Sequence, residues 1–158
     1  MKCILSILLL LSFSVSALGQ DLLGERIRRI TSRKKSIYLD KGIFHNGGPT
    51  VTSTLKAVRH NYNKSLGYER IVFDFKTKKI PKVYGHINSG NKNLYVDLFD
   101  TQLTKGINSF GKTKYVDSIN FFPISKETLS VELKFKEKVS VDIFYLDNPG
   151  RLVIDIKS

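Results

Sequence analysis

The sequence predicts an all-β protein, a two-sheet antiparallel β-sandwich preceded by a short basic N-terminal arm. Residues 68–75 and 151–156 share a pattern in which an arginine is followed by three apolar residues, an aspartate and another apolar residue. Several other segments alternate apolar and polar residues with the period of two that marks a strand with one buried face. After residue 50 no long run has helical spacing, so seven or eight short strands favour two packed sheets or a barrel-like closure of them.

The first nineteen residues have the features of a secretory signal, and residues 1–19 are expected to be a signal peptide. Lys2 is followed by an apolar run from Ile4 to Val15 and by small residues up to Gly19, where cleavage is expected. The run is shorter than the roughly 20 residues of a membrane-spanning helix, so no transmembrane anchor is expected. The protein is therefore expected to be exported, to the periplasm or the extracellular space.

The mature chain is expected to lack disulfides and to be strongly basic. Its only cysteine, Cys3, lies within the signal, and the about 139 residues left after cleavage can form one core. The formal net charge of +12 falls to about +11 without Lys2. Such a charge attracts anionic partners, which outside the cytoplasm are wall polymers, acidic lipids or polysaccharides rather than nucleic acid. The alternative is that the lysines only solubilise sheet faces and guard edge strands.

Residues 20–49 are expected to form a basic arm and loop in front of the domain. Six arginines and lysines lie between Arg26 and Lys35. Apolar residues from Leu22 to Ile30 fall near helical spacing, which allows a short amphipathic helix, and residues 37–39 could be a small strand. A flexible extension is the alternative. The sequence His-Asn-Gly-Gly-Pro at residues 45–49 is typical of a loop and places the domain boundary at residue 50.

The domain at residues 50–158 is expected to contain the strands. Weaker candidates than the two repeated segments are residues 51–60, 82–88 and 114–122, whereas residues 94–98, 129–135 and 139–143 alternate clearly. The turn-like Lys-Glu-Lys at residues 136–138 predicts that the segments on either side of it pair as a hairpin. Asp74 and Asp155 fall opposite the apolar faces of their strands and are expected to be exposed or paired with arginine.

The repeated segments also resemble a known family. Residues 57–60 (Ala-Val-Arg-His), 67–75 (Gly-Tyr-Glu-Arg-Ile-Val-Phe-Asp-Phe) and 146–156 (Leu-Asp-Asn-Pro-Gly-Arg-Leu-Val-Ile-Asp-Ile) together resemble the AMIN and AMIN-like domains. These are β-sandwich modules of bacterial envelope proteins, found in some N-acetylmuramoyl-L-alanine amidases and in secretins. The resemblance implies an envelope-binding or targeting module, with peptidoglycan as the ligand of amidase-linked members. It implies no catalysis, because a separate zinc-dependent domain performs the hydrolysis in those enzymes.

No catalytic residues, metal ligands or cofactors are expected. His45, His60 and His86 are spread without the spacing of metal ligands, and no cysteine accompanies them. No Gly-x-Ser-x-Gly or Ser-x-x-Lys motif occurs in a setting typical of hydrolases.

Tyrosines with lysines and arginines among them are the expected recognition surface. Tyrosine rings can stack on sugars while a neighbouring cation binds a carboxylate of a stem peptide or of muramic acid. The alternatives are half-buried packing for the tyrosines, and for the arginines the anchoring of a loop through carbonyls or a carboxylate such as that of Asp147. The candidate ligand-binding residues are Tyr68, Arg70, Tyr84, His86, Tyr95, Tyr145 and Arg151.

The sequence therefore predicts a non-enzymatic, exported envelope-binding module that recognises peptidoglycan or another anionic wall polymer. The alternative is a protein–protein adaptor that docks onto an envelope assembly, such as a secretin or wall-hydrolase complex, through an edge strand or the basic arm. Basic and aromatic residues together also suit single-stranded nucleic acid, but the secretory signal argues against that partner.

Overall fold

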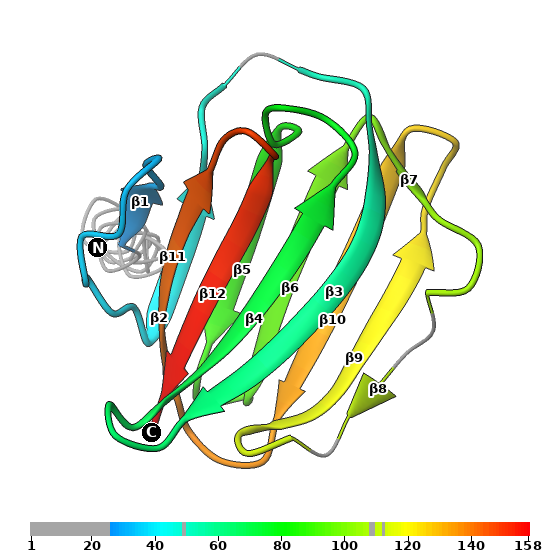
Figure 1. Ribbon diagram of the computed structural model, residues 1–158. Helices are drawn as coiled ribbons and strands as arrows, with labels where there is room; N and C mark the ends of the chain where they lie inside the picture. Colours follow the sequence, from blue (N-terminus) through cyan, green and yellow to red (C-terminus); the bar gives the residue numbers. More distant parts are fainter. Residues whose placement is uncertain (1–25, 49, 108–109, 112) are drawn as a thin grey trace, which may run out of the picture.

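The fold consists of two packed β-sheets (Figure 1). The computed structural model describes residues 26–48, 50–107, 110–111 and 113–158, and the expected signal peptide lies outside them. In this part of the chain there are twelve strands and no helix. The all-β sandwich predicted from the sequence is confirmed.

The larger sheet contains seven strands in the order β1-β2-β5-β6-β10-β9-β8. Neighbouring strands are antiparallel, except that β1 and β2 run parallel. The strands are β1 Ile27–Arg29, β2 Lys41–His45, β5 Val83–Asn88, β6 Asn93–Phe99, β8 Phe110–Gly111, β9 Val116–Pro123 and β10 Thr128–Phe135.

The smaller sheet contains five strands in the order β11-β12-β4-β3-β7, and only β3 and β7 run parallel. The two segments with the repeated pattern, β4 and β12, are antiparallel neighbours in this sheet. The sequence repeat therefore forms the middle of one sheet. The strands are β3 Ser53–Asn63, β4 Tyr68–Phe75, β7 Thr101–Leu103, β11 Ser140–Leu146 and β12 Arg151–Lys157.

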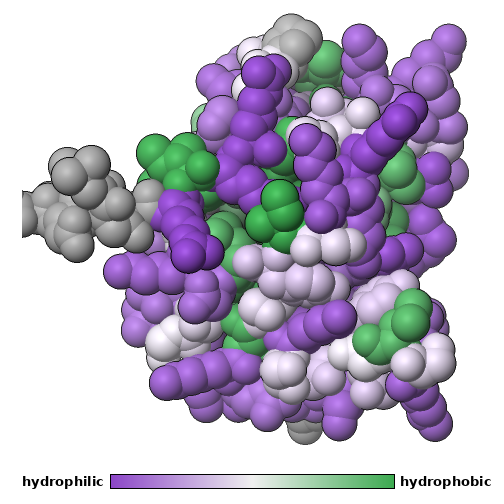
Figure 2. Space-filling model, turned by 90° about the vertical axis from the view of Figure 1, so that its left-hand side faces the viewer, coloured by the Kyte–Doolittle hydropathy of each residue, from purple (hydrophilic) through white to green (hydrophobic). Residues whose placement is uncertain are grey.

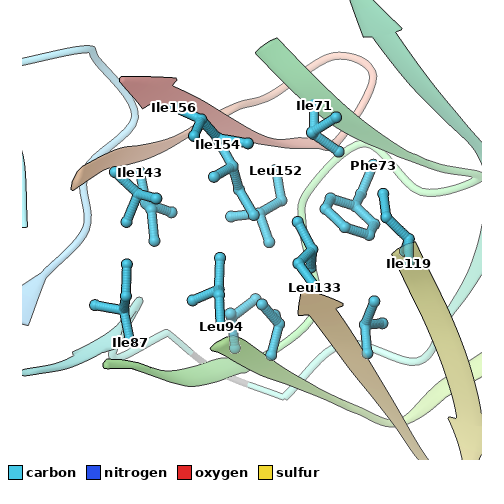
Figure 3. Close-up of a cluster of buried hydrophobic side chains, with 14 of the residues drawn as sticks. Ile71, Phe73, Ile87, Leu94, Ile119, Leu133, Ile143, Leu152, Ile154 and Ile156 are labelled. Carbon is cyan, nitrogen blue, oxygen red and sulfur yellow. The ribbon is translucent and has the colours of Figure 1, made fainter. Parts of the chain in front are cut away.

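The core lies between the sheets and is built mainly from alternate residues of the strands, although β11 and β12 are buried on both faces. Burial alternates along the whole of β4, so that one side of this strand faces the core and the other faces outward. Burying an apolar side chain as large as Ile71 or Phe73 of β4 stabilises the fold by about 1.5–3 kcal/mol. In Figure 3, Ile71, Phe73, Leu152, Ile154 and Ile156 of the smaller sheet face Ile87, Leu94, Ile119 and Leu133 of the larger one.

The structure corrects the separation of the basic arm from the domain. Residues 26–48 of the expected arm at 20–49 belong to the sandwich, because β1 and β2 are strands of the larger sheet. Residues 27–29 are extended and not helical. The short β2 escaped prediction because Ile43 and Phe44 place apolar side chains on both of its faces, which hides the period of two. Phe44 is completely buried.

The structure also corrects the expected hairpin of residues 129–135 and 139–143. β10 pairs with β6 and β9 in the larger sheet, whereas β11 pairs with β12 in the smaller one. The Lys-Glu-Lys segment between them therefore connects the two sheets. Alternation within a strand identifies its buried face but does not reveal which sheet the strand joins.

Two buried aspartates hold the arm against the smaller sheet. Asp142 of β11 and Asp155 of β12 lie directly opposite each other on its outer face, and both are fully buried. Like charges in this arrangement repel, so cations must compensate them. Arg28 donates to Asp142 at 2.7 Å, Lys34 donates to Asp155, and Arg70 of β4 donates twice to Asp155 at 2.6 and 2.8 Å. We call these five residues the aspartate clamp.

Backbone hydrogen bonds join the same arm to both sheets. The Ile30 amide donates to the His45 carbonyl of β2, and the Tyr145 amide of β11 donates to the Thr31 carbonyl. Leu39 and Val141 exchange two further bonds. The arm therefore closes the side of the sandwich between β2 and β11. Figure 2 views this side, where hydrophilic side chains predominate and hydrophobic ones form small separate groups.

Arg28→Ala is expected to lower the free energy of unfolding by about 3–5 kcal/mol, because the buried carboxylate of Asp142 loses its cation. Urea denaturation measures the change. The matched control is Arg33→Ala, which removes an exposed arginine of the same segment and is expected to change the free energy by less than about 0.5 kcal/mol. Equal effects of the two substitutions would contradict the clamp.

The contribution of Lys34 is expected to depend on pH. Burial by itself would lower the pKa of Lys34, but the hydrogen bond to Asp155 and its charge outweigh burial, and the pKa is raised above its ordinary value. Because the folded-state pKa is the higher one, the stabilisation is complete below the unfolded pKa of about 10.4 and is lost as the pH rises through the folded value.

The difference in unfolding free energy between the natural chain and Lys34→Met is therefore expected to be constant from about pH 7 to about pH 9 and to shrink above about pH 10.5. Urea denaturation across this range measures it. A difference that vanishes before about pH 9 would exclude the raised pKa of Lys34 as its origin.

Candidate functional site

The outer face of the larger sheet brings three predicted site residues together. Tyr84 and His86 are alternate residues of β5, and Tyr95 of β6 lies directly opposite His86. Buried residues occupy the positions between them, so all three side chains project away from the core. Tyr84 and Tyr95 remain 41% and 42% exposed. Two accessible tyrosines and a histidine thus share one surface.

A glycine positions this part of the sheet. A Cβ atom on Gly85 would lie 2.1 Å from the Phe44 ring, so only glycine leaves room for that ring beneath β5. The close approach lets β2 pair with β5 in a register that places Ile43 opposite His86 and His45 opposite Tyr84. The local sequence thereby extends the surface from β5 onto β2.

Hydrogen-bonding side chains surround the rings. Asp97 lies opposite Tyr84, and Glu132 of β10 lies opposite Tyr95. The Ser130 hydroxyl donates to Asp97 at 2.7 Å, and the Asn93 amide donates to the Tyr95 hydroxyl at 3.0 Å. These polar residues were not among the sequence candidates, although alternation along β6 and β10 could have placed them on the outer face.

Cations lie mainly around the margin of the same surface. Arg29, Lys41 and Lys134 are exposed on β1, β2 and β10. Lys134 approaches Glu132 to 3.6 Å. We call the surface formed by Tyr84, His86, Tyr95, Asp97 and Glu132, with these marginal cations, the tyrosine face. Its rings can stack, its carboxylates can accept hydrogen bonds from hydroxyl groups, and its margin can attract anions.

Tyr68 and Arg70 lie on the opposite side of the sandwich, beneath the arm. The Lys34 ammonium is 4.8 Å from the centre of the Tyr68 ring, and the Arg70 guanidinium is 5.2 Å from it. Hydrogen bonding to Asp155, above all, raises the pKa of Arg70. Both side chains are engaged in the aspartate clamp or its immediate contacts, which assigns them a structural role.

Arg151 begins β12 and lies opposite Asp74 on the same side as Arg70. Asp74 is instead bound twice by Arg59, at 2.6 and 2.8 Å. The Nε of Arg151 is buried and has no hydrogen-bond partner among the described residues, so no loop-anchoring bond to Asp147 from this atom is seen. The seven predicted residues therefore do not form one site.

Tyr145 occupies a third location. It is half-buried and packs against the core. Together with Asn46 and Ile80 it lines a small pocket of about 120 Å³ at the end of β11. Its ring contributes mainly to packing, which was the alternative considered for the tyrosines.

Neither a search for metal ligands and membrane helices nor a comparison with known proteins adds a further site. In the part of the chain that the structure describes, no three His, Cys, Asp or Glu side chains are placed to hold a metal ion. Nor does that part contain a helix with the length and hydropathy needed to cross a bilayer. No protein-family model matches the chain, and no curated protein matches its sequence.

Proposed function

We propose that this protein is a non-enzymatic, exported module that binds peptidoglycan or another anionic wall polymer through its tyrosine face. The observation that supports this proposal most strongly is the exposure of Tyr84 and Tyr95 on adjacent strands. The two tyrosines are diagonal neighbours, so they offer two stacking positions about 7–8 Å apart. The resemblance of β4 and β12 to AMIN domains supports the same class of function.

Binding would combine three kinds of contact. The tyrosine rings stack on the apolar faces of sugars, and Asp97 and Glu132 accept hydrogen bonds from sugar hydroxyls. Lys41 and Lys134 at the margin attract carboxylates or phosphates of the polymer. The net charge of the chain increases the local concentration of such a ligand. An open sheet face suits an extended polymer better than a small molecule, which usually requires a concave site.

The alternative function, a protein–protein adaptor that docks through the basic arm, receives less support. Arg28 and Lys34 are hydrogen-bonded to buried aspartates, so the arm would have to leave the sandwich before these residues could bind a partner. Removal of the arm would also remove β1, β2 and the buried side chains of Ile30 and Leu39, and would expose the core that they cover. We therefore give the tyrosine face precedence over an adaptor that docks through the basic arm.

The double substitution Tyr84→Ala and Tyr95→Ala is expected to weaken binding to purified peptidoglycan sacculi by about tenfold or more, because both stacking rings are lost. Co-sedimentation with sacculi over a range of protein concentrations measures the affinity. Raised salt should weaken the binding of the natural chain, because part of the attraction is ionic.

The control is Tyr68→Ala, which removes a tyrosine from the other side of the sandwich and should leave binding unchanged once folding is verified by circular dichroism. If the double variant were retained as strongly as the natural chain, the tyrosine face would not be the binding surface.

A further inference from the structure

The hairpin tip between β9 and β10 presents large apolar side chains to solvent. Ile124 of the tip is 68% exposed, and Phe122 near the end of β9, opposite Ser130 on the outer face of the larger sheet, is 47% exposed. The tip is held in shape, since the amides of Ile124 and Ser125 both donate to the Thr128 carbonyl, at 2.9 and 3.3 Å. The Glu127 amide donates to the Ser125 hydroxyl at 3.1 Å. The fold therefore holds Ile124 outward on a defined turn.

One lysine belongs to this tip, and four more lie in a loop at the same end of the sandwich. Lys126 belongs to the tip itself and is exposed. The β4–β5 loop lies at the same end of the sandwich (Figure 1). The Phe99 amide donates to the Lys82 carbonyl, and Phe99 pairs with Thr128 at the start of β10. The end of this loop is therefore linked through β6 to the β9–β10 hairpin. Its exposed lysines are Lys76, Lys78, Lys79 and Lys82.

Acidic residues at this end are fewer than the lysines. Asp100, Glu127 and Asp147 lie in the neighbouring turns, opposed by five lysines. The Lys82 ammonium lies 5.3 Å from the centre of the Phe99 ring, which joins cationic and apolar surface directly. Scattered apolar residues on a surface need no explanation, but an apolar tip within a group of lysines has the composition of a surface that binds anionic lipid.

We propose that this end of the sandwich docks on a membrane surface containing anionic lipid. Ile124 enters the headgroup region, with Phe122 at its margin, while the lysines of the tip and the β4–β5 loop contact lipid phosphates. The proposal goes beyond wall-polymer binding and uses different side chains. Docking through this end leaves His86 and Tyr95, which lie farther along β5 and β6, uncovered, whereas Tyr84 and Phe122 lie at the margin of the contact.

The opposite end supplies matched controls. The β3–β4 turn lies there (Figure 1), with Leu66 60% exposed and Lys64 also exposed. Leu66 resembles Ile124 in size and exposure, and each of the two turns contains one lysine, Lys64 or Lys126. A charge introduced at either position falls on an exposed turn and leaves the core intact.

The test is co-sedimentation of residues 20–158, which contain all the strands and omit the apolar signal, with lipid vesicles. Vesicles of phosphatidylcholine alone are compared with vesicles containing about 30% phosphatidylglycerol. Binding is expected only to the anionic vesicles and should weaken as salt is raised. Ile124→Glu and the pair Lys78→Glu with Lys79→Glu are each expected to weaken it by about tenfold or more. Leu66→Glu and Lys64→Glu should leave it unchanged.

Each contrary result has a definite meaning. Absence of binding to anionic vesicles, or equal losses for Leu66→Glu and Ile124→Glu, would overturn the proposal. It would also be overturned if Ile124→Glu kept full vesicle binding but lost binding to sacculi, since the tip would then serve the wall polymer. Tyr95→Ala, which removes the ring of the tyrosine face that lies farther from this end, should keep full vesicle binding but weaken binding to sacculi, which separates this proposal from polymer binding by the tyrosine face.

Discussion

The neutralisation of two fully buried aspartates is the constraint on which the rest of the structure depends. Asp142 and Asp155 face each other on neighbouring strands, and two carboxylates without water can be kept there only with cations beside them. Arg28 and Lys34 reach them from the arm. The arm is thereby fixed across the open side of the sandwich, and β1 and β2 become part of the larger sheet.

This constraint also gives the two outer faces different roles. In the smaller sheet, Arg70 from the first copy of the repeated pattern binds Asp155 from the second. The reciprocal pair, Arg151 with Asp74, lies in matching register but is not formed, because Arg59 binds Asp74. The main role of the repeated pattern is thus structural, since it joins β4 to β12 through one ion pair. The outer face of the larger sheet exposes tyrosines and hydrogen-bonding groups, and it is the face that we propose for recognition.

Local alternation was sufficient to predict strands with one buried face, and the predicted residues 68–75 coincide with β4. It could not predict pairing, because partner choice depends on contacts far along the chain, and so β10 and β11 were wrongly joined as a hairpin. The same limit affected the site. Tyr84 and Tyr68 both follow an outward-facing pattern, but only the strand order shows that they lie on opposite sides of the sandwich.

Nuclear magnetic resonance mapping with solubilised peptidoglycan fragments tests the central claim most directly. Amide signals of the isotopically labelled protein would be followed during titration. The account predicts that shifts and line broadening concentrate on β5 and β6 around Tyr84, His86 and Tyr95, while β4 and β12 remain unaffected. Perturbations centred on Arg70 and Arg151, with β5 and β6 silent, would contradict it and return recognition to the smaller sheet.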